Sequence, residues 1–320
     1  MTNSQPGSGD LAFSDTTKIA VLDIGSNSFH FVVGEMSNNS VKILYKLKQK
    51  VRLADGLSEH MVLSEAAIER GLEALEKIEQ RIQTYKPDSV KIVGTYTLRN
   101  ATNVDVFIQR AKSICSYPIE ILSGEDEAKL IFNGVAQTHL LDKPTLIIDI
   151  GGGSTEFVIG QHKEPEIATS LDMGCVSYTN RFFADGQMTD FAFESAISAA
   201  SNNLKQVQSA FKAMGWNKCL GTSGSVESLV SVIAQQSGLS LFKQSLTLDD
   251  LYILKALCIH TKDSDRLTIG EVNECRKHVF AAGLSIMIAA FQVLGVKELN
   301  VVSAALREGV MFNILDTMTQ

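Results

Sequence analysis

The chain has 320 residues, of which 45% are hydrophobic and 20% are charged, and its formal net charge is −7. This length and balance suit a globular protein of about two domains. The acidic net charge argues against a general nucleic-acid binder, although it is compatible with an anionic substrate held at a locally basic site.

The sequence gives no sign of a targeting segment. It has no run of roughly 18 apolar residues, so we expect no membrane span. The polar beginning lacks the order of a secretory signal, so we expect residues 1–17 to form a disordered tail. The cysteines are odd in number and lack C-x-x-C spacing, which favours reduced thiols in a cytoplasmic protein.

The first half of the chain begins with three predicted strands. Residues 19–34 have the pattern of a strand, a tight turn and a second strand, and residues 41–57 continue as a third. Apolar residues at helical spacing predict a helix over 64–84, with Ser64 as its N-cap. The other elements expected here are a strand at 90–95, a helix at 103–115, a strand at 119–122 and a helix at 124–138.

The second half opens in the same way. Residues 144–160 predict a strand, a turn and a strand, and a third strand follows near 166–171. The remaining expected elements are helices at about 189–213 and 224–236, a mostly helical stretch at 248–294, a strand at 298–302 and a helix at 305–316.

Strands that alternate with helices predict an α/β fold whose sheets contain parallel pairs. We expect an N-terminal domain over 18–140 and a C-terminal domain over 141–320, with the last helix, about 305–316, packing back on the first domain. No long linker separates the halves, so a close-packed pair with a cleft between the domains is expected.

The two halves share a repeated motif. The string VLDIGSNSFHFVVG at 21–34 returns at 147–160 as IIDIGGGSTEFVIG, with seven of fourteen positions identical at a constant offset of 126. Asp23 pairs with Asp149, and Gly25 pairs with Gly151. A repeat at half-chain spacing indicates two copies of one structural unit.

The residues of both turns suit an anion. Small residues allow close backbone approach, and successive N–H groups in a tight turn form an anion-binding nest. The phosphate-binding candidates are Gly25, Ser26, Asn27, Ser28, Gly151, Gly152, Gly153, Ser154 and Thr155. Because a carboxylate beside a phosphate repels it, Asp23 and Asp149 favour a Mg²⁺ ion between them and the substrate. The alternative is two ordinary turns in which each Asp makes a local bond. The sequence contains no Gly-Lys pair for a Walker A loop and no G-x-G-x-x-G opening a helix.

These paired turns resemble the two phosphate motifs of the actin, sugar kinase and heat-shock chaperone superfamily. More specifically, AVLDIGSNSFHFVVGE and LIIDIGGGSTEFVIG resemble the exopolyphosphatase and guanosine pentaphosphate phosphohydrolase family. The similarity continues through VRLADGL, VGTYTLRNATN, IEILSGEDEAKLIFNGV, DMGCVSYTNRFF, GTSGSVESL and LREGV, and it covers about residues 18–316. It implies two actin-like, ribonuclease H-like domains with a cleft between them. Longer members carry a further helical C-terminal region.

The resemblance also implies catalytic residues. The family's catalytic glutamate directly precedes an alanine, and Glu127 matches it; the alternative is a helix-capping role for this acid. Glu156, in the second turn, is a second candidate for binding metal or water. Arg99 matches the active-site arginine of the family and suits bidentate phosphate contact, whereas its alternative is a surface arginine. His30 matches the family's turn but stands on a strand, so we expect it to pack.

Two further features are open to two interpretations. Lys46, Lys48, Lys50 and Arg52 alternate, so a strand would project all four from one face, either as a track for a polyanion or as a solvated edge. The stretch GTSGSVESL enters a helix, where N–H groups bind anions, so its small residues either bind phosphate or allow close packing. The candidates there are Gly221, Ser223, Gly224 and Ser225.

The resemblance implies an exopolyphosphatase that releases orthophosphate from the end of inorganic polyphosphate. The alternative substrate is the 5′-terminal phosphate of guanosine pentaphosphate (pppGpp). Mg²⁺ is the expected cofactor, with a monovalent cation such as K⁺ as a second candidate, and a homodimer is left open. A kinase of the same superfamily and a non-catalytic sensor of polyphosphate or alarmones are the more distant alternatives.

Overall fold

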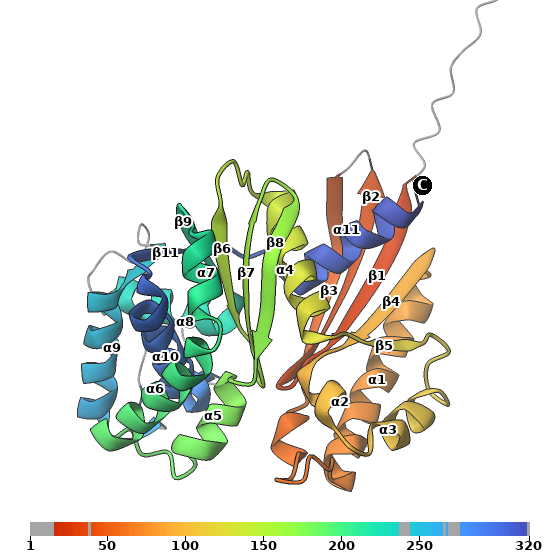
Figure 1. Cartoon of the computed structure of the whole chain (residues 1–320). Coiled ribbons are helices and arrows are strands. Elements are labelled where there is room, and N and C mark those ends of the chain that lie inside the picture. Colours follow the sequence, from red (N-terminus) through yellow and green to blue (C-terminus); the bar gives the residue numbers. More distant parts are fainter. Residues whose placement is uncertain (1–15, 38–39, 237–243, 265–266, 268–275, 319–320) are drawn as a thin grey trace, which may run out of the picture.

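The computed structural model describes residues 16–37, 40–236, 244–264, 267 and 276–318. The chain forms two β-sheets, each with its own helices, and two further helices lie between the sheets (Figure 1). Of the expected disordered tail, only residues 16 and 17 lie within the described residues. The α/β prediction with two actin-like domains is confirmed.

The first sheet has the strand order β3-β2-β1-β4-β5. β1, β2 and β3 pair antiparallel, whereas β4 and β5 extend the sheet in parallel. Its strands are β1 (Thr17–Ile24), β2 (Ser28–Ser37), β3 (Ser40–Lys50), β4 (Ser89–Gly94) and β5 (Ile119–Ile121). The third strand therefore ends at Lys50, and the stretch that follows forms a short 3-10 helix at Ala54–Gly56 rather than more strand.

The second sheet repeats this order as β8-β7-β6-β9-β11 and adds β10 at its edge. Its strands are β6 (Thr145–Ile150), β7 (Thr155–Gln161), β8 (Glu164–Leu171), β9 (Lys218–Thr222), β10 (Ser245–Thr247) and β11 (Glu298–Val301). β9 and β10 were not predicted, because each is short and stands beside glycine or polar residues.

Helices cover the outer faces of both sheets. The first sheet carries α1 (Glu65–Tyr85), α2 (Tyr96–Asn100) and α3 (Val104–Ala111). The second domain contains α5 (Cys175–Phe182), α6 (Asp190–Lys205), α7 (Gln208–Met214), α8 (Ser223–Gln236), α9 (Leu248–Thr261) and α10 (Lys277–Ala290). α2 and α5 were missed by the sequence analysis, since neither is longer than eight residues.

The inner faces of the sheets meet at what we call the seam, which α4 (Gly124–Thr138) and α11 (Leu306–Met318) fill. On β1, Ala20, Leu22 and Ile24 join the core with α1, whereas Ile19 and Val21 join the seam. α4 and α11 cross where Gly134 meets Gly309: a Cβ on Gly309 would lie 1.8 Å from the carbonyl oxygen of Leu130. α11 also contacts β1, so the end of the described chain lies on the first domain (Figure 1).

A serine caps the beginning of each of the helices α1 and α4, and the first of these caps was predicted. Ser64 precedes α1, and its hydroxyl accepts a hydrogen bond from the N–H of Ala67, as predicted. Ser123 does the same for α4 through the N–H of Asp126. These caps fix where the two helices begin.

One segment has the length and apolar composition of a membrane span, which the sequence analysis did not find. Residues Lys277–Gly295, which are α10 and the π-helical turn Phe291–Gly295, have a mean hydropathy of 1.7, and 83% of that window is buried inside the protein. Its side chains from Val279 to Ala290 are all buried, so α10 is the central core helix of the second domain.

The described cysteines are all free thiols. They are Cys115, Cys175, Cys219 and Cys258, and each is buried. Cys275 lies outside the described residues.

Candidate active site

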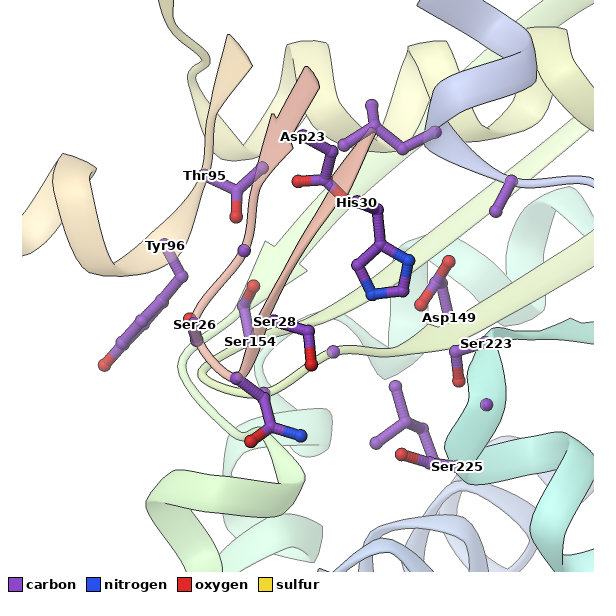
Figure 2. Close-up of a pocket in the computed structure, with 18 of the residues that line it drawn as sticks. Asp23, Ser26, Ser28, His30, Thr95, Tyr96, Asp149, Ser154, Ser223 and Ser225 are labelled. Atoms are coloured by element: carbon purple, nitrogen blue, oxygen red, sulfur yellow. The ribbon is translucent and has the colours of Figure 1, made fainter. Parts of the chain in front are cut away.

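Both hairpin turns open onto one cavity between the domains (Figure 2). Its volume is about 180 Å³, and its walls come from both hairpins, α4 and the beginnings of α8 and α11. The expected cavity residues found there are Asp23, Gly25, Ser26, Asn27, Ser28, Glu127, Asp149, Gly151, Gly152, Gly153, Ser154, Glu156, Ser223, Gly224 and Ser225.

Strand register explains why the carboxylates face the cavity. Asp23 is the next seam-facing residue after Val21 on β1, and Asp149 follows Ile147 on β6 in the same way. On the neighbouring strands, His30 stands opposite Asp23 and Glu156 stands opposite Asp149. Because directly paired residues project from the same side of a sheet, both rows face the cavity.

The tips of the two hairpins touch each other. A Cβ added to Gly152 would lie 2.8 Å from the Cβ of Ser26, and one added to Gly153 would lie 2.0 Å from the Tyr96 ring. Tyr96 begins α2 in the first domain and is buried. The glycines of the second turn are therefore required for contact between the domains, and not only for backbone approach to an anion.

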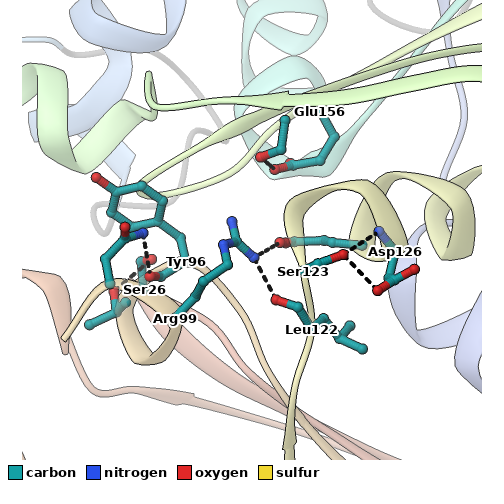
Figure 3. A network of polar contacts seen from close by, with 11 residues as sticks. Ser26, Tyr96, Arg99, Leu122, Ser123, Asp126 and Glu156 are labelled. Atoms are coloured by element: carbon teal, nitrogen blue, oxygen red, sulfur yellow. Dashed lines mark hydrogen bonds and ion pairs between the residues drawn. The ribbon is translucent and has the colours of Figure 1, made fainter. Parts of the chain in front are cut away.

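Glu127 on α4 makes an ion pair with Arg99 on α2. Arg99 Nη1 donates to Glu127 Oε2 at 3.0 Å and to the carbonyl oxygen of Leu122 at 3.0 Å (Figure 3). Glu127 is 7% exposed, and burial raises its pKa to about 7, although Arg99 opposes that shift.

The other acids at the beginning of α4 point elsewhere. Asp126 accepts a hydrogen bond from the hydroxyl of Ser123 at 2.6 Å, and Glu125 is exposed and pairs with Lys129 one turn later. Of the three acids in the first turn of α4, only Glu127 lines the cavity. Asp126 takes part in the N-terminal cap, and Glu125 lies on the surface.

Four carboxyl groups of the cavity form what we call the acidic wall: Asp23, Glu127, Asp149 and Glu156. Glu127, Asp149 and Glu156 are buried, whereas Asp23 is half-buried with its Oδ1 atom inaccessible to solvent. Burial raises the pKa of Asp23 to about 6 and that of Glu156 to about 8. The pKa of Asp149 is raised well above its usual range, first by burial and then by the charge of Glu156. Like charges close together in a buried site resist ionisation, so this wall favours protons or cations.

Positive charge lines the same cavity as the acidic wall, and Arg307 opposes the upward pKa shifts of Asp23 and Asp149. Lys48, Arg276 and Arg307 line the cavity, and all three lower the pKa of His30, which burial already lowers, to about 3. Arg307 Nη1 lies 3.2 Å from His30 Nδ1. Arg276 and Arg307 were not predicted as site residues; Arg307 lies in the motif LREGV, and its position at the start of a helix after a strand was the available signal.

Several polar atoms of the cavity have no hydrogen-bond partner. Asp23 Oδ1, Asn27 Oδ1 and Ser223 Oγ are buried, line the cavity and are unpartnered in the described part of the chain. Ser223 also has a left-handed backbone with φ 85°. Because orphaned buried polar atoms are costly, they mark the surface that a polar ligand or cation would satisfy.

Four predicted site residues do not line the cavity: Arg52, Arg99, Thr155 and Gly221. Thr155 directly precedes Glu156 on β7, so its side chain lies on the opposite face of the sheet. There its buried hydroxyl donates to the carbonyl oxygen of Met173. Gly221 packs instead, since a Cβ there would lie 2.5 Å from Leu299. Arg52 follows the end of β3 with φ 51°, and its exposed side chain lies 3.9 Å from Asp55. Arg99 reaches the cavity only through Glu127.

Two sheets of the same strand order, each presenting a glycine hairpin and a carboxylate to a shared cavity, define a two-domain protein of the actin-like class. The family is shown by the sequence: residues 32–318 match the Ppx/GppA phosphatase family, to which the chain belongs.

Solved structures agree with this fold. An exopolyphosphatase from Cytophaga hutchinsonii superposes with a TM-score of 0.84 at 26% identity, over 94% of this chain and 98% of the other. The Aquifex aeolicus member of the Ppx/GppA family superposes with a TM-score of 0.79 at 22% identity, over 95% of this chain and 99% of the other.

Curated relatives fall into two length classes. A guanosine-5'-triphosphate,3'-diphosphate pyrophosphatase of Aeromonas hydrophila is 40% identical over 92% of this chain, but the match covers 59% of that relative. A Haemophilus influenzae protein provisionally named an exopolyphosphatase is 39% identical over 93% of this chain and 91% of its own length. The chain thus spans about 59% of the longer relatives and nearly all of the shorter one.

Proposed function

We propose that this protein is an exopolyphosphatase, which hydrolyses the terminal phosphoanhydride bond of inorganic polyphosphate and releases orthophosphate. The observation that carries the proposal is one cavity that joins two hairpin turns, the Arg99–Glu127 pair and a separate set of cations. Phosphoryl transfer needs charge neutralisation, an oriented water and in-line geometry, and this cavity supplies groups for each.

Glu127 acts on the attacking water. Its pKa of about 7 lets it accept a proton near neutral pH, which is the condition for a general base. Arg99 holds the Glu127 carboxylate by a 3.0 Å hydrogen bond and is itself held by the carbonyl oxygen of Leu122. Water attacks the terminal phosphorus, the bond to the bridging oxygen breaks, and the shortened chain leaves with its negative charge facing Lys48, Arg276 and Arg307.

The chemistry of the acidic wall fits Mg²⁺. Asp23 Oδ1 is buried without a partner, and Asp149 and Glu156 are buried acids on the facing hairpin. In the described residues, no three His, Cys, Asp or Glu side chains are arranged to hold one ion together, so substrate oxygens and water would complete the shell, as is usual for Mg²⁺. When bound, the ion would neutralise charge on the phosphate oxygens; Asp23, Asp149 and Glu156 are the residues we assign to it. A K⁺ site stays a prediction.

Guanosine pentaphosphate is the second candidate substrate. The relatives from Aeromonas hydrophila and Pseudoalteromonas atlantica, each 40% identical, are both named guanosine-5'-triphosphate,3'-diphosphate pyrophosphatase. The phosphoanhydride bond is the same in both substrates, so the two readings share every catalytic residue. The short relative and the Cytophaga hutchinsonii structure support the polyphosphate reading. A cytoplasmic location is part of the proposal, because both substrates are intracellular phosphates in this reading.

The test is a side-by-side rate comparison on polyphosphates of several lengths and on guanosine pentaphosphate, with and without Mg²⁺. We expect orthophosphate release from long polyphosphate, dependence on the divalent ion and no transfer of phosphate from ATP to an alcohol. Release only from guanosine pentaphosphate would replace the first substrate by the second. Binding of either substrate without any phosphate release would instead favour the sensor alternative, and phosphate transfer from ATP would favour a kinase.

A further inference from the structure

We propose that Lys46, Lys48 and Lys50, called here the lysine row, form a binding track for a polyanion that extends out of the cavity along β3. The inference rests on the proposed function. It concerns the length of the substrate, because a long phosphate chain reaches beyond the cavity and a short one does not. A compact triphosphate end would fill the cavity alone, whereas a long polyphosphate would also cover the row.

The register of β3 puts the row on the same face as the catalytic groups. Lys50 is paired with Ser28, Lys48 with His30 and Lys46 with Val32. Ser28 and His30 line the cavity, and Val32 belongs to the seam. Since paired residues project to one side, all three lysines project from the seam face of the sheet.

The opposite face of β3 is different in character. Tyr45 and Leu47 pack against the core that contains α1. Lys42 also stands on that face, paired with Glu35, because a bulge between Val33 and Gly34 shifts the register before it. The strand thus separates a charged row from an apolar one, and Lys42 is a lysine of the same strand outside the row.

The middle of the row lies in the cavity wall, and its two ends lie outside the cavity. Lys48, the middle residue, lines the cavity, whereas Lys46 and Lys50 do not, and all three are exposed. Alternate residues of a strand are about 7 Å apart, so Lys46 and Lys50 each lie about 7 Å from Lys48, on either side of it along β3. Three like charges at this spacing repel one another unless solvent or an anion lies along them.

Lys48 connects the cavity with the rest of the row. In the proposed function the acidic wall, which includes Glu127, takes the terminal phosphoryl group, and Lys48, Arg276 and Arg307 line the same cavity. A phosphate chain longer than the cavity that leaves it past Lys48 meets Lys46 or Lys50 as the next cation. An edge strand often carries lysine only to prevent pairing with another sheet. That role needs no particular face, whereas here the lysines continue a line of cavity residues.

The experiment compares Lys46→Gln/Lys50→Gln with Lys42→Gln, which removes one charge from the other face of the same strand. For each protein, kcat/KM is measured on a long polyphosphate of tens of units and on tripolyphosphate. We expect the ratio of long to short to fall about tenfold in the double variant, the loss expected for two exposed charge contacts, and to stay at the wild-type value in Lys42→Gln. The wild-type ratio falls as salt rises, and the double variant loses most of that salt dependence.

An unchanged ratio in a folded double variant, with its thermal unfolding midpoint at the wild-type value, would overturn the track. An equal fall in Lys42→Gln would do the same, because it would reduce the effect to net charge. Binding of long polyphosphate to Glu127→Gln protein, with and without the two lysines, separates this inference from the proposed function. Tenfold weaker binding without the lysines would support the track even if the wild type released no phosphate, and equal binding would overturn it.

Discussion

The two hairpins share a backbone plan and differ in the charges that they present to the cavity. In the first, the row across β1, β2 and β3 reads Asp23, His30 and Lys48. In the second, the row across β6, β7 and β8 reads Asp149, Glu156 and Ser170. The first row therefore has an acid at one end and a lysine at the other. The second row has two adjacent acids, and the hydroxyl of Ser170 donates a hydrogen bond to one of them, Glu156.

This difference assigns different work to two copies of one unit. The second hairpin and Glu127 carry the cavity carboxyl groups whose pKa values are raised furthest, which fits our proposal that a cation binds beside them. The first hairpin carries His30, whose pKa is lowered to about 3 by burial and by Arg307, Lys48 and Arg276, the cations to which we assign the leaving phosphate chain. The two copies share the aspartate, and they differ in the residue paired with it, which is His30 in the first hairpin and Glu156 in the second.

The largest expected effect comes from replacing the proposed general base, Glu127, which belongs to neither hairpin. Glu127→Gln should lower kcat by about a thousandfold, because general-base catalysis contributes 10² to 10⁴. Glu125→Gln, an exposed acid on the same helix paired with Lys129, is the matched control and should keep the wild-type rate. Phosphate release by Glu127→Gln at more than a tenth of that rate would remove Glu127 from the mechanism. Binding of polyphosphate, measured separately, should remain.

The contact between the hairpin tips predicts the next largest effect. In Gly153→Ala the new methyl group would overlap the Tyr96 ring, and overpacking of this kind costs about 1 to 3 kcal/mol. We expect activity to fall about five- to hundredfold, because the two turns would no longer come together. Tyr96→Ala in the same chain should recover part of that loss. If Gly153→Ala alone were fully active, the tips need not touch during turnover.

These residues also indicate how far the sequence alone could reach. The repeat located both hairpins, helical periodicity with Ser64 located α1 closely, and α4 was expected over the residues that it occupies. Register could not be read with the same certainty: Thr155 and Glu156 are neighbours, yet one faces the core and the other the cavity. Arg276 and Arg307 reach the cavity from far along the chain, through packing that no local pattern records. Gly153 was assigned to phosphate approach because its partner, Tyr96, lies in the other domain.

The acidic wall predicts a pH dependence whose sign follows from the raised pKa values. Between about pH 4, where these carboxyls would ionise in the unfolded chain, and pH 8, the acidic wall binds more protons in the folded protein than in the unfolded one. His30, with its lowered pKa, acts in the opposite direction below about pH 6, but the four carboxyls of the wall outnumber it. Stability without divalent ions should therefore fall as pH rises through this window. We expect the thermal unfolding midpoint, measured in a chelator, to drop from pH 5 to pH 8, and to drop less in Glu156→Gln. Added Mg²⁺ should recover most of the loss at pH 8. A midpoint that rises over this range would contradict the raised pKa values.

The smallest expected effect tests the hydroxyl that ends the second row. Ser170 Oγ donates to Glu156 Oε1 at 2.7 Å, and this bond lowers the pKa of Glu156 against the larger effect of burial. Ser170→Ala should therefore raise that pKa further and move the acidic limb of the kcat/KM profile to higher pH by about half a unit, with a loss of about threefold at pH 7. Thr169→Ala, on the opposite face of β8, should leave the profile in place. A loss of activity with no movement of the profile would mean that Ser170 supports the strand and not the charge of Glu156.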